Sequence, residues 1–295
     1  MGRAMAGKYD QRLLDLYDGY AHGFITRREF LDRAGKITVS GMTAAAALAA
    51  LSPDYALANQ VSPDDSSIDA SSQDYDSPDG AGEMRGYLVK PAGVSGKIGG
   101  VVVIHENRGL NPYVKDVARR VAKAGFLAFA PDALHPLGGY PGNDDEGRAM
   151  QSKRDRAKMF EDFVAAVRFL QRHEDCNGHV GCVGFCYGGG VANALAVRIP
   201  ELACAVPFYG RQPPLDDVPK IRAPLMIHHG GLDERLNAGW PAYKEALDTA
   251  GKIYEEFTYA GANHGFHNDT TPRYDPDAAE LAWRRSVEFF QKYLV

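Results

Sequence analysis

Short apolar runs alternate with helical patterns along the chain from residue 86 onward. The run GGVVVIHE at residues 99–106 is almost continuously apolar, which is typical of a strand in a sheet covered on both faces. By the same criteria we expect strands at residues 86–91, 99–106, 126–134, 179–185, 204–210, 223–230 and 254–261, and helices at residues 113–125, 154–173, 189–199, 239–251 and 276–294. This alternation predicts an α/β fold with a mainly parallel central sheet and helices on both faces.

The chain is long enough to bury one large hydrophobic core. It has 295 residues, of which 45% are hydrophobic, and its formal net charge is −5. We therefore expect a single catalytic domain. The acidic balance and the lack of a Lys/Arg-rich run argue against nucleic acid as a partner and favour a small molecule. A homo-oligomer is compatible with this sequence.

Residues 1–58 have the features of an export leader. TRREFL at residues 26–31 precedes an uncharged, alanine-rich run over 37–53 and then ALA at 56–58, the order found in twin-arginine signals of periplasmic proteins. The run is too short and too weakly apolar for a membrane span. The alternative is a cytoplasmic protein that keeps this segment as a helical arm, because QRLLDLYDGY at residues 11–20 is amphipathic and a reactive thiol would risk oxidation in a periplasm.

The remainder of the chain divides into two parts. Residues 59–82 are rich in Asp, Ser and Pro and show no apolar period, so we expect a linker or an edge segment there. Residues 83–295 contain every strand and helix expected above and form the predicted catalytic domain.

The cysteines do not indicate a disulfide framework or a metal site. Four of them, at positions 176, 182, 186 and 204, are too few and too unevenly spaced for disulfides, so we interpret them as free thiols. His179, Cys182 and Cys186 are ligand types, but neither a CxxC nor an HxxxH pair accompanies them, and no metal is predicted. No organic cofactor is predicted either, because the sequence has no GxGxxG after its first strand and no GxxxxGK[ST].

One turn between an expected strand and an expected helix carries a GxCxG motif. Gly184, Cys186 and Gly188 occupy the positions at which GxSxG forms a nucleophile elbow, a sharp turn that lifts the nucleophile above the sheet. The N-terminus of the following helix favours a thiolate at that place. Taken alone, the cysteine would be a small buried hydrophobic residue, as most free cysteines are.

Two further residues follow Cys186 in the order that a catalytic triad on such a sheet requires. Asp233 comes after the strand at 223–230, and His264 comes after the strand at 254–261, on the loop before the last helix. Asp233 alone could be a helix cap, and His264 alone could be a loop histidine. Together with the cysteine they indicate a Cys-His-Asp triad, whereas His228 lies inside a buried run and is interpreted as a packed strand residue.

These motifs resemble the dienelactone hydrolase family, a cysteine-using branch of the α/β-hydrolase fold. The resemblance spans residues 83–294 and is carried by HEN at 105–107, GFCYGG at 184–189, GLDE at 231–234 and NHGF at 263–266. It implies an α/β-hydrolase fold and a hydrolase of carboxylic esters or lactones. It also implies a role for Glu106, because a glutamate at this place in the family contacts the resting cysteine and takes its proton when substrate arrives.

The sequence departs from the family at one position. Well-known members have an arginine a few residues after the histidine that holds the substrate carboxylate, whereas this chain has His267 and Asn268 there. Arg108 and Arg211 follow strand ends, where they would replace that contact or lie as solvated loop residues. Tyr209 is a further candidate for contacting the substrate.

The predicted reaction is acyl transfer to water through a thioester on Cys186. His264 accepts and later donates the proton, and Asp233 fixes the orientation and tautomer of the imidazole. The backbone N–H groups of Tyr187 and Asn107 are expected to form the oxyanion hole. Two alternatives stay open on the same fold: a general carboxylesterase or thioesterase, and a non-catalytic protein that binds a small molecule.

Overall fold

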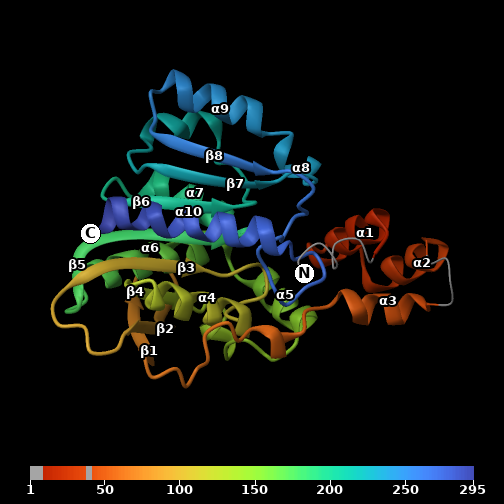
Figure 1. Ribbon diagram of the computed structural model, residues 1–295, viewed down its shortest axis with the longest axis horizontal. Helices are drawn as coiled ribbons and strands as arrows, with labels where there is room; N and C mark the ends of the chain where they lie inside the picture. The colour runs from red at the N-terminus through yellow and green to blue at the C-terminus, as the bar shows by residue number, and fades with distance from the viewer. Residues whose placement is uncertain (1–8, 38–41) are drawn as a thin grey trace.

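A computed structural model describes the protein at residues 9–37 and 42–295. Its centre is an eight-stranded sheet with the order β1-β2-β4-β3-β5-β6-β7-β8 (Figure 1). The strands are β1 (Ile68–Ser77), β2 (Gly82–Pro91), β3 (Ile98–Ile104), β4 (Leu127–Pro131), β5 (Cys176–Phe185), β6 (Cys204–Phe208), β7 (Leu225–Gly230) and β8 (Tyr254–Tyr259). Pairing is antiparallel from β1 to β4 across β2 and parallel from β4 to β8, so the prediction of a mainly parallel sheet is confirmed.

Helices connect the parallel strands as the sequence pattern predicts. The helices are α1 (Gln11–Ala21), α2 (Arg27–Ile37), α3 (Ala44–Leu51), α4 (Pro112–Lys123), α5 (Asp144–Lys153), α6 (Arg156–Arg172), α7 (Tyr187–Arg198), α8 (Glu234–Asn237), α9 (Trp240–Thr249) and α10 (Pro276–Leu294), with short 3-10 segments η3 (Tyr55–Leu57), η4 (His135–Leu137) and η5 (Leu215–Lys220). Every expected strand and helix is present, with its ends shifted by a few residues.

The sheet separates two apolar cores. Side chains of α4 and α10 cover one face, and side chains of α6, α7 and α9 cover the other. Successive residues of β3 face opposite sides, so Val101 and Val103 pack in the first core while Val102 and Ile104 pack in the second. This explains why the strand is apolar at every position instead of at alternate positions.

β1 and α5 are among the elements that the sequence pattern did not predict. β1 lies within residues 59–82, at the edge of the sheet, and most of its side chains are exposed, so the segment shows no apolar alternation. α5 lies in what the sequence pattern indicated as a loop rich in Gly, Asn and Asp. Asn143 caps its N-terminus by accepting from Glu146 N at 3.0 Å, and its first turn is acidic, which favours a helix despite the polar composition.

The three N-terminal helices form a small unit with an apolar core of its own, which we call the N-terminal arm (residues 9–37 and 42–58). Tyr17, Phe30, Ala34, Leu48 and Leu51 are buried between α1, α2 and α3. The arm lies at the end of the sheet where β7 leads into α8, beside the carboxyl ends of the parallel strands (Figure 1).

The structure describes only part of the predicted leader segment. Residues 1–8, and 38–41 of its alanine-rich run, lie outside the described residues. Within the two described ranges, no helix combines the length and the apolar character that a membrane crossing needs.

Glycines at the β5–α7 turn permit a close crossing of three chain segments. A Cβ atom added to Gly184 would overlap the Gly188 carbonyl, and one added to Gly188 would overlap the Ile104 carbonyl of β3. Neither glycine needs a positive φ, so the requirement here is space for backbone atoms. The turn therefore depends on the absence of two side chains.

Gly184→Ala is expected to lower the free energy of unfolding by about 3 kcal/mol, because the new methyl group meets backbone atoms that cannot rotate away. Gly35→Ala is the matched control, since Gly35 is exposed in α2 with no atom within 4 Å of an added Cβ, and there alanine should stabilise by about 1 kcal/mol. Urea denaturation of both variants measures these changes. Similar stabilities for the two variants would contradict the close crossing.

Candidate active site

Cys186 lies on the sharp turn between β5 and α7, as predicted. Its backbone has φ 57° and ψ −112°, a conformation that non-glycine residues rarely adopt and that concentrates at functional sites. The amide of Cys186 donates to the Phe208 carbonyl at 3.1 Å, which ties the turn to β6. α7 begins at the next residue, so its positive end lies beside the sulfur and favours a thiolate.

Asp233 and His264 are brought together as predicted. His264 Nδ1 lies 2.5 Å from Asp233 Oδ2, and both side chains are buried. Asp233 also caps α8, because its Oδ1 accepts from Leu236 N at 3.4 Å, so both roles considered for this residue occur together. Burial raises the pKa of Asp233, but the hydrogen bond and charge of His264 outweigh it and lower that pKa overall. The strand residue His228 is fully buried, as expected.

An unpredicted histidine makes the hydrogen bond to the cysteine. His22 follows the last residue of α1, and its Nε2 lies 3.1 Å from Cys186 Sγ. Its Nδ1 donates to the Asp18 carbonyl at 2.7 Å and lies 3.3 Å from an Asp18 carboxylate oxygen. In the described part of the chain no hydrogen bond joins His264 to Cys186, although the ring centres of His22 and His264 are 4.7 Å apart. Two Asp–His pairs therefore flank one thiol.

The charged side chains around Cys186 support an ion pair between His22 and Cys186. Burial alone would lower the pKa of His22, but the Cys186 thiolate and Asp18 raise it to about 9. Burial likewise raises the pKa of Asp18, and the charges of His264, His22 and Arg273 reverse that effect and hold it well below its usual range. At neutral pH His22 is thus an imidazolium whose Nε2 lies 3.1 Å from Cys186 Sγ.

Polar contacts from the catalytic domain hold α1 over the cysteine. They are Arg273 Nη1 to Asp18 Oδ1 at 2.8 Å, Asn107 Nδ2 to the Ala21 carbonyl at 2.9 Å, and Arg148 Nη1 to the Tyr20 carbonyl at 2.6 Å. The last two carbonyls belong to the final turn of α1, and the Tyr20 carbonyl also accepts from Gly23 N at 2.9 Å. The arm therefore enters the site through the end of one helix, capped by side chains of the catalytic domain.

Glu106 is placed differently from what the family resemblance implied. Its carboxylate is buried and accepts from Asn268 Nδ2 at 3.1 Å, and the hydrogen bond to Cys186 comes from His22 instead. His267, the other residue at the departure from the family pattern, is buried and contacts the Tyr113 hydroxyl at 2.7 Å. In this conformation the partner of the resting thiol is an imidazole of the arm.

Cys186 borders a cavity of about 1260 Å³ that is open to solvent. The predicted residues Asn107, Tyr187 and Arg211 line it together with Cys186, and so does the unpredicted His22. Its other lining residues that carry a positive charge are Arg148, Arg156, Arg198 and Lys220. The cavity is the place at which a small substrate would reach the thiol.

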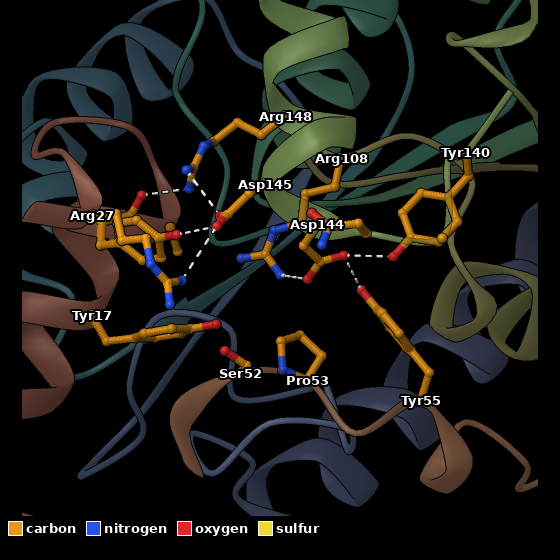
Figure 2. A pocket seen from close by; sticks show the side chains of 14 residues that line it. Tyr17, Arg27, Ser52, Pro53, Tyr55, Arg108, Tyr140, Asp144, Asp145 and Arg148 are labelled. Carbon is orange, nitrogen blue, oxygen red and sulfur yellow. Dashed lines mark hydrogen bonds and ion pairs between the residues drawn. The ribbon is translucent and has the colours of Figure 1, made fainter. Parts of the chain in front are cut away.

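Arg108 and Tyr209 do not line this cavity. Arg108 is buried and pairs with Asp144 at 2.8 Å in a separate pocket of about 260 Å³ between the arm and the catalytic domain, shown in Figure 2. Tyr209 is fully buried, and its ring centre lies 4.9 Å from that of His264. Arg108 therefore belongs to the arm interface and Tyr209 packs beside His264, and neither residue lines the cavity that Cys186 borders.

Sequence reasoning missed the contributions of Asp18, His22 and Arg273. The available signal was the spacing of Asp18 and His22, which places them four residues apart on one face of a helix that already looked amphipathic. Nothing local in the sequence indicates that this face meets Cys186. Arg273 lies nine positions beyond His264, whereas the family's arginine is expected only a few residues after the histidine.

One group of side chains in the described part of the chain has the types and spacing of metal ligands. One ring nitrogen each of His22 and His264 and the Cys186 sulfur all lie within 4.8 Å of one another. The group considered from the sequence is not assembled, because the side chain of Cys182 is fully buried in β5 while His179 is exposed.

Comparison with known proteins decides the family. The sequence pattern of the dienelactone hydrolase family matches residues 84–294, more than half of the chain, and a pattern described as YqhI-like matches residues 1–37. The chain belongs to the dienelactone hydrolase family. It is accordingly a hydrolase of carboxylic ester or lactone bonds, on the α/β-hydrolase fold that the sequence predicted.

Several known proteins match this family member over nearly all of their own length. An Escherichia coli (strain K12) protein named as a hydrolase fragment, YghX, is 62% identical over 39% of this chain and 97% of its own. A Bradyrhizobium protein named as a probable 2-oxo-3-(5-oxofuran-2-ylidene)propanoate lactonase is 34% identical over 72% of this chain and 91% of its own. The crystal structure of a dienelactone hydrolase-like promiscuous phosphotriesterase from metagenomic libraries has a TM-score of 0.67 and 25% identity, covering 78% of this chain and all of the other.

His22 should make the stability of this dienelactone hydrolase family member depend on pH. Its pKa rises from the ordinary 6.5 to about 9 in the folded chain, so the folded state binds the proton more tightly. The resulting stabilisation is fully present below about pH 6.5 and is lost as the pH rises through about 9, with a size of at most about 3 kcal/mol. Urea denaturation of the wild type between pH 6 and pH 9.5 measures the total dependence.

His22→Gln removes the titrating group and isolates its share of that dependence. The difference in unfolding free energy between wild type and variant should shrink as the pH rises across this window. His179→Ala, which changes an exposed histidine outside the site, should leave the wild-type dependence intact. A constant difference between wild type and His22→Gln would show that His22 does not bind its proton more tightly in the folded chain.

Proposed function

We propose that this protein hydrolyses an activated ester or lactone through a thioester on Cys186, with His264 and Asp233 as the acid–base pair. One observation supports this most strongly: the Cys186 thiol borders an open cavity and has two imidazoles near it, each with a carboxylate behind it. A nucleophile, a base and a group that orients the base are the parts that acyl transfer requires.

The first half of the reaction forms the thioester. The Cys186 thiolate attacks the carbonyl carbon, and negative charge collects on the carbonyl oxygen. The N–H of Tyr187 has no carbonyl partner in the first turn of α7, and Asn107 follows the end of β3, so their N–H groups are the proposed oxyanion hole. Each such donor contributes roughly 3 to 4 kcal/mol to the transition state. The intermediate then expels an alkoxide or enolate, which takes the proton of His22.

The second half of the reaction restores the enzyme. His264 accepts a proton from water while the water oxygen attacks the thioester carbon, and Asp233 stabilises the imidazolium that forms. Cleavage of the C–S bond returns the Cys186 thiolate and releases a carboxylic acid, which loses its proton to solvent. The proton on His264 passes to His22, and the resting ion pair is restored.

A cysteine at this position favours particular substrates. With the His22 imidazolium beside it, the thiol supplies a thiolate without a base that acts during the attack. A thiolate is also a good leaving group, so the tetrahedral intermediate returns to substrate unless the substrate's own leaving group is better. We therefore propose enol esters and enol lactones, in preference to amides, as the substrate class.

The charge of the cavity favours an acidic substrate. Among the residues that the structure describes, no carboxylate pairs with Arg211, whereas Lys220 of the same cavity pairs with Asp217 at 2.6 Å. An unpaired guanidinium at the cavity wall offers a bidentate contact for a carboxylate. This supports Arg211, of the two arginines considered from the sequence, as the residue that holds the substrate anion.

The proposal requires that the arm stays attached, because His22 belongs to it. Of the two fates considered from the sequence, we therefore propose the retained arm and a cytoplasmic location. Export through the twin-arginine route, with cleavage near Ala58, would remove the Asp18–His22 pair from the mature protein. The intact mass of the protein isolated from its native cells distinguishes these two fates directly.

Cys186→Ser is expected to lower kcat/KM on activated esters by at least about 1000-fold, because the neighbour that is hydrogen-bonded to it, His22, acts as a proton donor in the proposed reaction and does not remove the proton of a hydroxyl. Cys182→Ser is the matched control, since Cys182 is buried in β5 away from the cavity and should affect mainly stability. Mass spectrometry of acid-quenched wild type should find a transient acyl group on the Cys186 peptide. Equal activities of the two variants would contradict the proposed nucleophile.

Arg211→Gln is expected to raise KM about tenfold for a carboxylate-bearing ester and to leave KM for its uncharged methyl ester nearly unchanged. Lys220→Gln, in the same cavity but already neutralised by Asp217, should change neither value much. Steady-state kinetics with both esters tests this. Equal effects of the two substitutions on the charged ester would remove Arg211 as its specific partner.

A further inference from the structure

Three side chains from distant parts of the chain converge on one point beside the open cavity, which His22 and Cys186 line. His22 comes from the arm, Cys186 from the β5–α7 turn and His264 from the loop before α10, and their ligand atoms lie within 4.8 Å of one another. We propose that this cluster is a zinc site with His22 Nε2, His264 Nε2 and Cys186 Sγ as ligands. The proposal depends on this ligand set and is independent of which bond the enzyme cleaves.

The spacing suits a tetrahedral ion after small movements. Zinc bonds of roughly 2.0–2.1 Å to nitrogen and 2.3 Å to sulfur place neighbouring ligand atoms about 3.3 to 3.6 Å apart. His22 Nε2 and Cys186 Sγ are 3.1 Å apart, and the cluster as a whole extends to 4.8 Å. Shifts of about 1 Å in the imidazole rings would close the remaining difference.

Both imidazoles are held in the orientation that metal-binding histidines adopt. His22 Nδ1 is bound by the Asp18 carbonyl and lies near its carboxylate, and His264 Nδ1 is bound by the Asp233 carboxylate. A hydrogen bond at Nδ1 places the proton there and leaves the lone pair on Nε2 as the donor to a metal. The two carboxylates behind the imidazoles also favour a dication between them electrostatically.

An unsatisfied atom points independently to a missing ligand. His264 Nε2 is buried and makes no hydrogen bond within the residues that the structure describes, although its side chain is only 6% exposed. Buried nitrogens without a partner are rare because the lost hydrogen bond is costly. A metal ion bound at Nε2 would satisfy this atom.

The ligand types select zinc among the common dications. One thiolate and two imidazoles suit zinc, whereas magnesium and calcium prefer oxygen ligands. Cys186 and His22 both line the open cavity, so a water molecule can occupy the fourth position, as in zinc sites that are accessible to solvent.

Zinc binding would link the arm to the catalytic domain and prevent Cys186 from acting as a nucleophile. The ion forms bonds to one sulfur and two nitrogens, and the proton that His22 holds beside Cys186 leaves to solvent. While zinc is bound, the sulfur lone pair is committed to the metal, and the imidazole of His264 cannot accept a proton. The cluster would then act as a zinc-dependent off switch in which the arm supplies one ligand.

The test is binding of zinc alone to the full-length, metal-free protein. Competition with a chromophoric chelator should show one zinc per chain, and cobalt should give the intense thiolate-to-metal charge-transfer band that imidazole ligands alone do not produce. His22→Gln and Cys186→Ser should each weaken zinc binding by more than about 100-fold. Asp18→Asn, which weakens both the support of His22 and the contact of the arm with Arg273, should weaken it by roughly 10- to 100-fold.

His179→Ala and Cys176→Ser are the controls and should bind zinc as the wild type does, because neither residue belongs to the cluster. Circular dichroism confirms that each variant is folded. Wild-type affinity in the folded His22→Gln variant would overturn the proposal, and so would a folded wild type that binds no zinc at micromolar concentration. Failure of ester hydrolysis would leave the binding result unchanged, so this proposal and the proposed reaction fail separately.

Discussion

The turn at Cys186 is the constraint on which the rest of the site depends. Its backbone stands at φ 57°, and the glycines around it let the β5–α7 turn pass close to the β3 carbonyl. Because of this geometry the sulfur lies at the carboxyl end of the sheet, next to the first turn of α7 and at the wall of the cavity. The strands on either side then only have to end at the same edge for Asp233 and His264 to reach the same place.

The N-terminal arm supplies the side chains that lie beside the sulfur of Cys186. The proposed reaction needs a thiolate on Cys186, which is costly near a buried core unless a cation lies beside it, and the His22 imidazole lies 3.1 Å from the sulfur. The imidazolium is in turn supported by Asp18, whose charge is balanced by Arg273 of the catalytic domain. The chain of charges alternates in sign from the cysteine to the arginine. Removal of any member would leave its neighbours buried with an unbalanced charge.

The fold, and the contact between Asp233 and His264, could be predicted because their signals lie in short stretches of sequence. Continuous apolar runs marked strands such as β3, and the order of Cys186, Asp233 and His264 fixed which strand ends must meet. β1 was not predicted as a strand because most side chains of this edge strand are exposed, so its sequence shows no alternation of apolar and polar residues. The contact of His22 with Cys186 was not predicted, because it depends on how the whole arm docks on the catalytic domain. That docking uses contacts between residues far apart in sequence, such as Asp18 with Arg273. No short window of sequence contains that information.

The N-terminal arm has the composition of an export leader and also the side chains of a packed helical unit. The same residues can serve both purposes, which accounts for the resemblance to a leader. Small and apolar residues in α3 give the composition of an export signal, and they also pack against Phe30 and Tyr17 in the core of the arm. The acidic and aromatic residues of α1 are unnecessary for export, yet they supply Asp18, His22 and the face that covers the cysteine. A segment selected only for transport would have no reason to place a carboxylate one helical turn before a histidine. The contacts at its C-terminal end, from Asn107 and Arg148 to two carbonyls of α1, are those of a helix cap supplied by a folded domain. These features support the proposal that the arm is retained and lies over the thiol of Cys186.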